Sequence, residues 1–261
     1  MNAIERLFFE KKEKNEGVLI PFIVCGDPNF EKTIELGNML FDAGADILEL
    51  GIPFSDPIAD GPVIESASYR ALKAGMNPNK AMEIANSLHQ RGAVVFMTYY
   101  NILLQYGLSE FVSDCKKNGV DGIIIPDLPL EESDPLYAEC KKQDIALIFL
   151  VSPTTDSKRL KQIVDKTKGY LYLVSTLGVT GAKEKVADIT KELIANVKKV
   201  AQDKIPLAVG FGISKPEHVT EILNLGADGV IVGSAIVKLI QNNAISELKE
   251  FVSDLKKSTK K

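Results

Sequence analysis

Ala43-Gly44-Ala45-Asp46-Ile47-Leu48 is one of three copies of a Gly-x-Asp-apolar phrase, and the positions of these copies indicate how the chain folds. The other copies are Asn118-Gly119-Val120-Asp121-Gly122-Ile123-Ile124-Ile125 and Leu225-Gly226-Ala227-Asp228-Gly229-Val230-Ile231-Val232. Each copy puts a glycine that can end a helix directly before an apolar run typical of a buried strand. The phrase therefore predicts the passage from a helix into a strand.

The spacing of these glycines indicates repeated βα units. Gly44 and Gly119 are 75 residues apart, and Gly119 and Gly226 are 107 apart. These distances correspond to two and three units of roughly 36 residues. Such units force the strands to run parallel, joined by right-handed crossovers.

The rest of the chain supplies enough strands and helices for eight such units. Apolar runs predict strands at 18–25, 47–50, 94–99, 122–125, 146–151, 170–174, 207–210 and 229–232. Amphipathic segments predict helices at 29–43, 79–91, 109–118, 131–142, 157–165, 191–202 and 215–225. Eight βα pairs in about 250 residues favour an α/β TIM (β/α)8 barrel with an extra N-terminal helix. A doubly wound open sheet is the structural alternative that periodicity leaves open.

Composition and charge limit the possible classes of protein. The 261 residues are 45% hydrophobic and 25% charged, without a linker-like stretch, so we expect a single domain over residues 1–261. The net charge of −4 and the lack of a basic stripe argue against nucleic-acid binding. The charged N-terminus is unlike a signal peptide, and no apolar run approaches about 18 residues. We therefore expect a soluble cytoplasmic protein that does not contact membranes.

The cysteines and the basic C-terminus do not indicate a site. Cys25, Cys115 and Cys140 are widely separated, without a C-x-x-C pair or histidines at metal-ligand spacing, so no metal site is predicted. An odd number of free thiols fits a reducing compartment. The lysine-rich end at 256–261 is expected to be a frayed, solvated tail.

The expected strands are almost free of charged side chains. They contain no Lys, Arg or His, and Glu49 is their only charged residue. A Schiff-base aldolase requires a lysine, and a metal-dependent aldolase or epimerase requires clusters of histidines or carboxylates. The strands therefore argue against both kinds of enzyme and leave Glu49 as a candidate catalytic group.

Glu49 is expected to point into the barrel. The strand period of two puts Leu48 and Leu50 on the face that meets the outer helices, and Ile47 and Glu49 on the opposite face. A desolvated carboxylate without a basic neighbour has a pKa above its usual value of about 4.3. Glu49 is thus a candidate proton carrier near neutral pH. The alternative is a structural glutamate bonded by backbone N–H groups or by a loop lysine.

A second carboxylate, Asp60, lies in the loop that follows this strand. Pro53, Pro57 and Pro62 stiffen the loop. An isolated Asp-Gly pair is usually only a turn, but a simple connection does not need a rigid loop. Asp60 is therefore a second candidate catalytic residue, whereas Asp56, before Pro57, is expected to form a turn or a partner contact.

Glycine-rich turns after the last three expected strands predict a phosphate site. They are Gly178-Val179-Thr180-Gly181, Gly210-Phe211-Gly212-Ile213-Ser214 and Gly233-Ser234-Ala235, the last of which opens a short helix. Small residues let backbone N–H groups approach an anion, and a helix N-terminus adds its dipole. TIM barrels commonly hold phosphate near their last two strands, so we expect a neutral phosphate cradle here. Plain turns and helix caps are the alternative.

Together these motifs resemble the tryptophan synthase alpha chain family. The similarity rests on residues 48–62, 178–181, 210–214 and 233–237, and it extends in order and spacing over 21–237. The resemblance implies a lyase of the carbon–oxygen class that cleaves indole-3-glycerol phosphate to indole and glyceraldehyde 3-phosphate by a retro-aldol reaction in tryptophan biosynthesis. Glu49 and Asp60 match the two acidic catalytic positions of the family.

The resemblance also implies binding residues and a partner. Substrate contacts are expected from Phe22, Tyr100, Leu128, Tyr172, Thr180, Gly181, Phe211, Gly212, Gly233 and Ser234, the first four on the indole side. Contacts with a tryptophan synthase beta chain, in an alpha2-beta2 heterotetramer, are expected from Asp56, Pro57, Asp127 and Pro129. No cofactor is expected in this chain, since pyridoxal phosphate belongs to the beta chain. The chain departs from the family pattern at Thr176, where many members carry arginine.

Several functional alternatives stay open at this point. The long connection at 175–190 predicts a lid over the substrate or, alternatively, a disordered insertion. A regulatory subunit that mainly activates a beta chain would use a contact face at 55–59 and 127–130. Another phosphosugar barrel enzyme, such as indole-glycerol-phosphate synthase or a pentose-phosphate epimerase, is disfavoured because the strands lack lysine and histidine.

Overall fold

The strands form one parallel sheet that closes into a barrel. The computed structural model describes residues 1–174, 183–210 and 212–260. Within these ranges, nine strands pair side by side in the order β5-β4-β3-β2-β1-β9-β8-β7-β6. Their bounds are β1 (Val18–Val24), β2 (Ile47–Gly51), β3 (Ala93–Met97), β4 (Gly122–Ile124), β5 (Ala146–Ile148), β6 (Leu150–Val151), β7 (Leu171–Val174), β8 (Leu207–Gly210) and β9 (Gly229–Val232).

The predicted eight-stranded TIM barrel is confirmed. Only Phe149 separates β5 from β6, so these two are parts of one strand. That strand pairs in parallel with β4 through one part and with β7 through the other, which closes the sheet on itself. An open doubly wound sheet would leave its two edge strands unpaired with each other.

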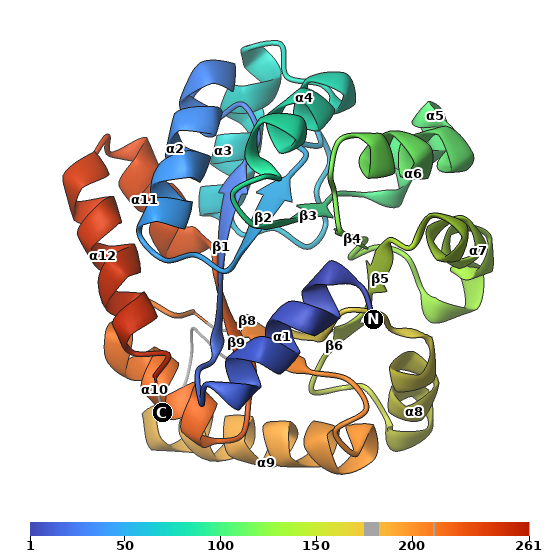
Figure 1. Ribbon diagram of the computed structural model, residues 1–261, viewed down its shortest axis with the longest axis vertical. Helices are drawn as coiled ribbons and strands as arrows, with labels where there is room; N and C mark the ends of the chain where they lie inside the picture. Colours follow the sequence, from blue (N-terminus) through green and yellow to red (C-terminus); the bar gives the residue numbers. More distant parts are fainter. Residues whose placement is uncertain (175–182, 211, 261) are drawn as a thin grey trace.

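Helices surround the barrel, and one of them lies across its end. Figure 1 shows the strands inside a ring of helices, with α1 (Ala3–Glu13) crossing the middle of the ring. The others are α2 (Phe30–Asp42), α3 (Pro62–Lys73), α4 (Pro78–Leu88), α5 (Tyr100–Tyr106), α6 (Leu108–Lys117), α7 (Asp134–Gln143), α8 (Ser157–Lys166), α9 (Lys183–Ala201), α10 (Pro216–Asn224), α11 (Ser234–Gln241) and α12 (Ile245–Lys257). Ile4 and Phe8 of α1 are buried against inward-facing strand residues such as Val18 and Ala146. The extra N-terminal helix therefore plugs the end where the strands begin.

The side chains of β2 alternate between two cores, as the sequence predicts. Ile47 belongs to the cluster inside the barrel, together with Val95. Leu48 and Leu50 belong to the larger cluster between the strands and the helices. Glu49 is fully buried, and its position between Leu48 and Leu50 directs it to the interior.

The aspartates of the repeated phrase join neighbouring strands at the end that α1 covers. The Asp46 carboxylate accepts the Leu19 N–H at 2.9 Å, and the Asp46 N–H donates to the Leu19 carbonyl at 3.0 Å. The same two bonds join Asp121 to Val94, at 3.0 and 2.8 Å, and Asp228 to Leu207, both at 2.8 Å. We call these pairs the aspartate clamps. Each clamp fastens the start of one strand to the start of the strand beside it.

The basic C-terminus is docked on this end of the barrel. Lys256 of α12 pairs with Asp46 at 2.6 Å, and Lys11 of α1 pairs with the same carboxylate at 2.9 Å. Thr259 is fully buried, and its carbonyl accepts the N–H of Gly17 at 2.8 Å. The prediction of a frayed tail is therefore wrong for the described residues 256–260, because Lys256 meets an acidic group 210 residues earlier in the chain.

Asp46→Ala is expected to lower the free energy of unfolding by about 3 kcal/mol. Two lysines and the Leu19 N–H lose their shared partner, at a site where the Asp46 side chain is only 7% exposed. The matched control is Asp42→Ala, because that side chain pairs with Arg91 but is 57% exposed. A change below about 1 kcal/mol is expected there. Urea unfolding followed by circular dichroism measures both variants, and equal losses would contradict the role of Asp46.

α9 begins earlier than the sequence predicts. It starts at Lys183, whereas the predicted start was at 191, so the prediction of a continuous loop over 175–190 is wrong for 183–190. That stretch contains neither Gly nor Pro, and its Lys, Glu and Ala residues favour helix. The remainder of the predicted lid, 175–182, lies outside the described residues.

α3, α5 and α12 were not predicted. In the part of the chain that the structure describes, no helix combines the length and apolar composition needed to cross a membrane.

Candidate active site

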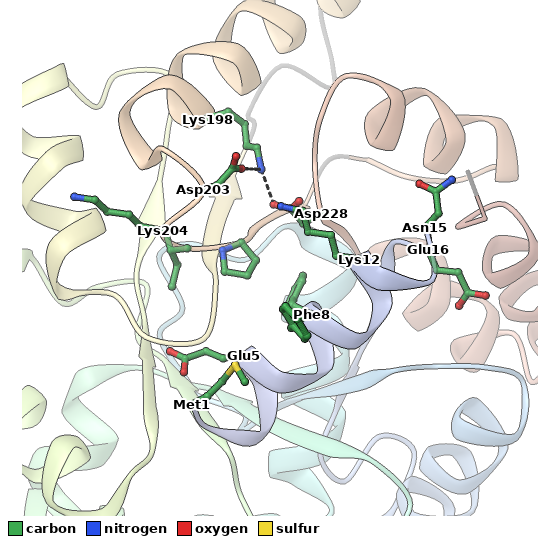
Figure 2. A pocket seen from close by; sticks show the side chains of 13 residues that line it. Met1, Glu5, Phe8, Lys12, Asn15, Glu16, Lys198, Asp203, Lys204 and Asp228 are labelled. Carbon is green, nitrogen blue, oxygen red and sulfur yellow. Dashed lines mark hydrogen bonds and ion pairs between the residues drawn. The ribbon is translucent and has the colours of Figure 1, made fainter.

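Two large cavities lie at opposite ends of the barrel. One, of about 510 Å³, is at the end where the strands begin, between α1 and the segment leading into β8. Figure 2 shows Lys198 bonded to both Asp203 and Asp228, at 3.1 and 2.9 Å. Because Asp228 also clamps β8 to β9, these charges stabilise the fold. This cavity is therefore the weaker candidate for catalysis.

The other cavity, of about 440 Å³, is bordered by both predicted catalytic carboxylates, Glu49 and Asp60. It lies where the strands end, since Val174 and Gly210, the last residues of β7 and β8, also border it. TIM barrels carry their active sites at this end. This cavity is the candidate active site.

Glu49 is a buried carboxyl group without a hydrogen-bond partner. It lies in register with Phe22 of β1 and Val95 of β3, and neither of its oxygens is hydrogen-bonded to any described residue. Burial raises the pKa of Glu49 to about 8. The structural alternative, a glutamate held by N–H groups or a lysine, therefore lacks support in the described part of the chain. A proton on Glu49 near neutral pH is available for transfer.

Asp60 is half-buried and held in its loop by neighbouring contacts. The Tyr99 hydroxyl hydrogen-bonds to Asp60 and accepts the N–H of Ala59 at 3.1 Å. Burial raises the pKa of Asp60, although the Tyr99 hydrogen bond opposes this change. The helix that follows, α3, is anchored because Arg70 donates two N–H bonds to Asp27, both at 2.8 Å. The loop therefore presents Asp60 from a fixed position.

Two of the aromatic residues predicted for the indole side border the cavity. They are Phe22 of β1 and Tyr172 of β7. A Cβ atom at Gly51 would lie 2.6 Å from the Phe22 ring, and a Cβ atom at Gly210 would lie 2.6 Å from the Tyr172 ring. Glycine at these two positions therefore makes room for the rings. Burial and the nearby carboxylates Glu49 and Asp60 raise the pKa of Tyr172, so this hydroxyl stays protonated.

The glycine-rich turns also reach the cavity. Gly212, Gly233 and Ser234, three of the residues that the sequence predicts for a phosphate site, border it. Gly233 is the N-cap of α11 and has no side chain to accept the first N–H groups of that helix. Those groups are therefore available to an anion. Thr180, Gly181 and Phe211, the other residues predicted for this part of the site, lie outside the described residues.

Two predicted indole contacts are not among the residues that border the cavity. Tyr100 is half-buried at the start of α5, and Leu128 is buried in the loop after β4. The Tyr100 N–H donates to the Asp127 carboxylate at 2.9 Å, which ties the chain after β3 to the loop after β4. Substrate contact by Tyr100 and Leu128 stays a prediction.

The residues predicted to contact a partner lie in loops that follow β2 and β4. Asp56 and Pro129 are exposed, and Pro57 and Asp127 are half-buried. Ile58, in the first of these loops, is 79% exposed. The loops are thus accessible at the end of the barrel that carries the candidate active site.

The cavity also has bordering residues that were not predicted. Met97 and Leu150 follow the alternation of inward-facing strand positions, so the strand period could have identified them. Lys238 lies one helical turn after Ser234, and that i, i+4 spacing could have placed it beside the phosphate turn. The described residues contain no cluster of three or more His, Cys, Asp or Glu suited to a metal ion. Cys25, Cys115 and Cys140 are free and buried.

Comparison with known proteins agrees with the motifs and the fold. The family model for the tryptophan synthase alpha chain matches residues 8–261. The tryptophan synthase alpha chain of Methanocaldococcus jannaschii is 54% identical over 90% of this chain and 84% of its own length. That of Methanosarcina barkeri is 45% identical over 99% of this chain and 97% of its own.

Solved structures give the same result. A chain in the tryptophan synthase α2β2 complex of Pyrococcus furiosus is 40% identical, with a TM-score of 0.86, over 92% of this chain and 98% of that one. A chain of tryptophan synthase from M. tuberculosis has a TM-score of 0.92 at 29% identity, over the full length of both chains. On the strength of the family match and these relatives, the chain belongs to the tryptophan synthase alpha chain family.

Proposed function

We propose that this chain is the lyase that cleaves indole-3-glycerol phosphate to indole and glyceraldehyde 3-phosphate in tryptophan biosynthesis. The observation that carries the proposal is one cavity bordered both by two carboxylates, Glu49 and Asp60, and by the phosphate turns at Gly212 and Gly233. Membership of the tryptophan synthase alpha chain family supports the same reaction.

Glu49 is proposed to move the proton that the cleavage requires. Its carboxylic acid form donates a proton to indole C3, which turns the ring into a cationic indolenine. The resulting carboxylate then takes the proton of the glycerol hydroxyl next to the bond that breaks. The electron pair of that carbon–carbon bond returns to the ring, indole and the aldehyde form, and Glu49 is again protonated. The raised pKa of about 8 supports this role, since the acid form predominates at pH 7.

Asp60 is proposed to stabilise the charge that develops on the indole ring. An ionised carboxylate near the indole N–H accepts its hydrogen bond, and the bond strengthens as the nitrogen becomes positive. The Tyr99 hydroxyl supports the ionised form of Asp60 by hydrogen-bonding to it. Two carboxyl groups with separate roles are therefore sufficient for the reaction.

The substrate contacts are proposed as the sequence predicts them. Phe22, Tyr172, Tyr100 and Leu128 would face the indole ring, and Thr180, Gly181, Phe211, Gly212, Gly233 and Ser234 would surround the phosphate. The positions of Phe22, Tyr172, Gly212, Gly233 and Ser234 at the cavity support this assignment. Since acid–base catalysis performs each step, no cofactor is proposed for this chain.

The proposed partner is a tryptophan synthase beta chain, which would hold pyridoxal phosphate. The related Pyrococcus furiosus protein is described as an α2β2 complex. Asp56, Pro57, Asp127 and Pro129 would contact the beta chain, and the exposure of Ile58 nearby supports this surface. We also propose that residues 1–261 form one domain and that the enzyme works in the cytoplasm.

The proposal is tested by measuring indole released from indole-3-glycerol phosphate, first by the chain alone and then with a tryptophan synthase beta chain. Release by the chain alone, increased by the beta chain, is the expected result. Release only in the presence of the beta chain would favour a regulatory subunit. Turnover of carboxyphenylamino-deoxyribulose phosphate would instead favour the phosphosugar alternative, and no release under either condition would contradict the proposed activity.

A further inference from the structure

Charge in the candidate active site is distributed over three side chains. Among the described residues that border the cavity, only Glu49, Asp60 and Lys238 carry ionisable acidic or basic groups other than tyrosine. The proposed substrate brings a phosphate with up to two negative charges, and the chain itself has a net charge of −4. Lys238 is therefore the one cationic side chain on the described wall of the cavity that can offset the charge of the phosphate.

The position of Lys238 suits contact with a phosphate at the start of α11. Ser234, Ala235 and Lys238 all border the cavity, and the i, i+4 spacing stacks Lys238 directly above Ser234 on the helix. Side chains on a helix lean toward its N-terminus, so the four-carbon stem of Lys238 extends toward the first turn. Gly233, the N-cap residue, has no side chain that could accept hydrogen bonds from the N–H groups of that turn. An anion there would meet both the N–H groups and the ammonium.

The ammonium of Lys238 is not committed to another partner. No described residue forms an ion pair or hydrogen bond with it, and the side chain is exposed to solvent. Lys198, which borders the opposite cavity, differs in this respect because Asp203 and Asp228 neutralise it. The charge of Lys238 is thus available to a ligand.

We infer that Lys238 is the cation that binds the substrate phosphate and selects phosphorylated substrates over uncharged ones. The inference rests on the proposed function and replaces the neutral cradle that the sequence predicts. Because the phosphate keeps its charge throughout the cleavage, its contact with Lys238 stabilises the bound substrate and the transition state equally, and such uniform binding lowers KM without changing kcat. The expected signature is consequently a change in KM, with kcat little affected.

The first test compares three variants by steady-state indole release. Lys238→Gln is expected to raise KM for indole-3-glycerol phosphate by roughly 10-fold to 30-fold, a loss of affinity typical of one charge-assisted hydrogen bond. The same variant is expected to change kcat by less than about twofold. Lys238→Arg is expected to restore most of the affinity. Lys249→Gln, on the exposed face of α12, changes the net charge equally and serves as the matched control with unchanged kinetics. Equal KM values for Lys238→Gln and Lys249→Gln would overturn the inference.

The second test removes the phosphate from the substrate. With indole-3-glycerol, which lacks the phosphate, wild type and Lys238→Gln are expected to have the same kcat/KM. Added salt is expected to raise KM for the phosphorylated substrate in the wild type more than in Lys238→Gln. Salt screens the attraction between the Lys238 ammonium and the phosphate, and the variant lacks this attraction. Equal losses of Lys238→Gln on both substrates would show that Lys238 acts on the fold or the catalytic groups, which would also overturn the inference.

The third test separates this inference from the proposed function. Calorimetry with glycerol 3-phosphate measures phosphate binding without any turnover. Binding that weakens roughly 10-fold or more in Lys238→Gln, but not in Lys249→Gln, supports the inference even if the wild type releases no indole. Unchanged binding in Lys238→Gln contradicts it even if the wild type is an active lyase. Thermal unfolding by circular dichroism verifies that the variants are folded.

Discussion

Glu49→Gln is expected to leave a folded protein that releases indole at less than about one hundredth of the wild-type rate. The amide fills the same space but cannot donate a proton to indole C3 or remove one from the glycerol hydroxyl. The loss is expected in kcat, because the indole and phosphate contacts are unchanged. Single-turnover measurement of indole at saturating substrate determines the effect. Near-wild-type turnover by this variant would refute the assignment of Glu49.

The same substitution is expected to stabilise the protein at neutral pH. The pKa of Glu49 is about 8 in the folded chain and 4.5 when unperturbed, so the folded state holds a proton that the unfolded state releases between these values. The stability associated with this proton is complete below pH 4.5 and is lost as the pH rises through about 8. At pH 7 the free energy of unfolding of the wild type is about 3 kcal/mol lower than below pH 4.5 because of Glu49. Glu49→Gln has no ionisable group at this position, so it does not lose this stability.

Thermal unfolding of the two proteins from pH 5 to 8 tests this effect. The melting temperature of Glu49→Gln is expected to exceed that of the wild type by an amount that grows with pH. A gap independent of pH would mean that Glu49 does not carry a raised pKa. Activity provides a parallel readout, because kcat/KM of the wild type is expected to fall as the pH rises through about 8 and the acid form disappears.

Asp60→Asn is expected to lower kcat by about 100-fold or more while the protein stays folded. Asparagine preserves the size of the side chain, but a neutral amide cannot balance the positive charge of the indolenine. The Tyr99 hydroxyl can still donate to the asparagine oxygen, so the loop is expected to keep its position. Indole release at saturating substrate measures the loss.

Asp56→Asn is the matched control for this effect, since it makes the same chemical change in the same loop on an exposed side chain away from the cavity. It is expected to leave the intrinsic rate of the isolated chain unchanged. Equal rates for Asp60→Asn and Asp56→Asn would contradict a catalytic role for Asp60.

The barrel could be predicted from the sequence because its determinants are local. Each strand is a short apolar run beside a turn signal, and alternation alone sufficed to direct Glu49 inward and Leu48 outward. Contacts distant in sequence were not predictable in this way. Lys256 looked like part of a solvated tail because nothing near it in the chain shows that Asp46 will receive it.

The residues of the candidate site also differ in how clearly the sequence identifies them, because some of them depend on contacts that are distant in the chain. Glu49 stands out as a charge inside an apolar strand, whereas Asp60 resembles an ordinary turn residue until the fold brings it to the same cavity. The i, i+4 spacing places Lys238 one helical turn after Ser234, but the sequence pattern does not show whether its charge serves a ligand or is merely solvated. Its importance depends on the other charges at the cavity, which come from β2 and the loop that follows it.

The aspartate clamps have a consequence for the order in which the chain assembles. They join residues only 27, 27 and 21 positions apart, so each closes a short loop that contains one helix or, between Val94 and Asp121, the two helices α5 and α6. Short loops lose little entropy on closure and form early along a folding pathway. We expect the N–H groups of Leu19, Val94 and Leu207 to be among the first to gain protection in pulsed hydrogen exchange during refolding. Three locally closed βαβ modules would then precede the closure of the barrel, which requires the distant pairing of β1 with β9.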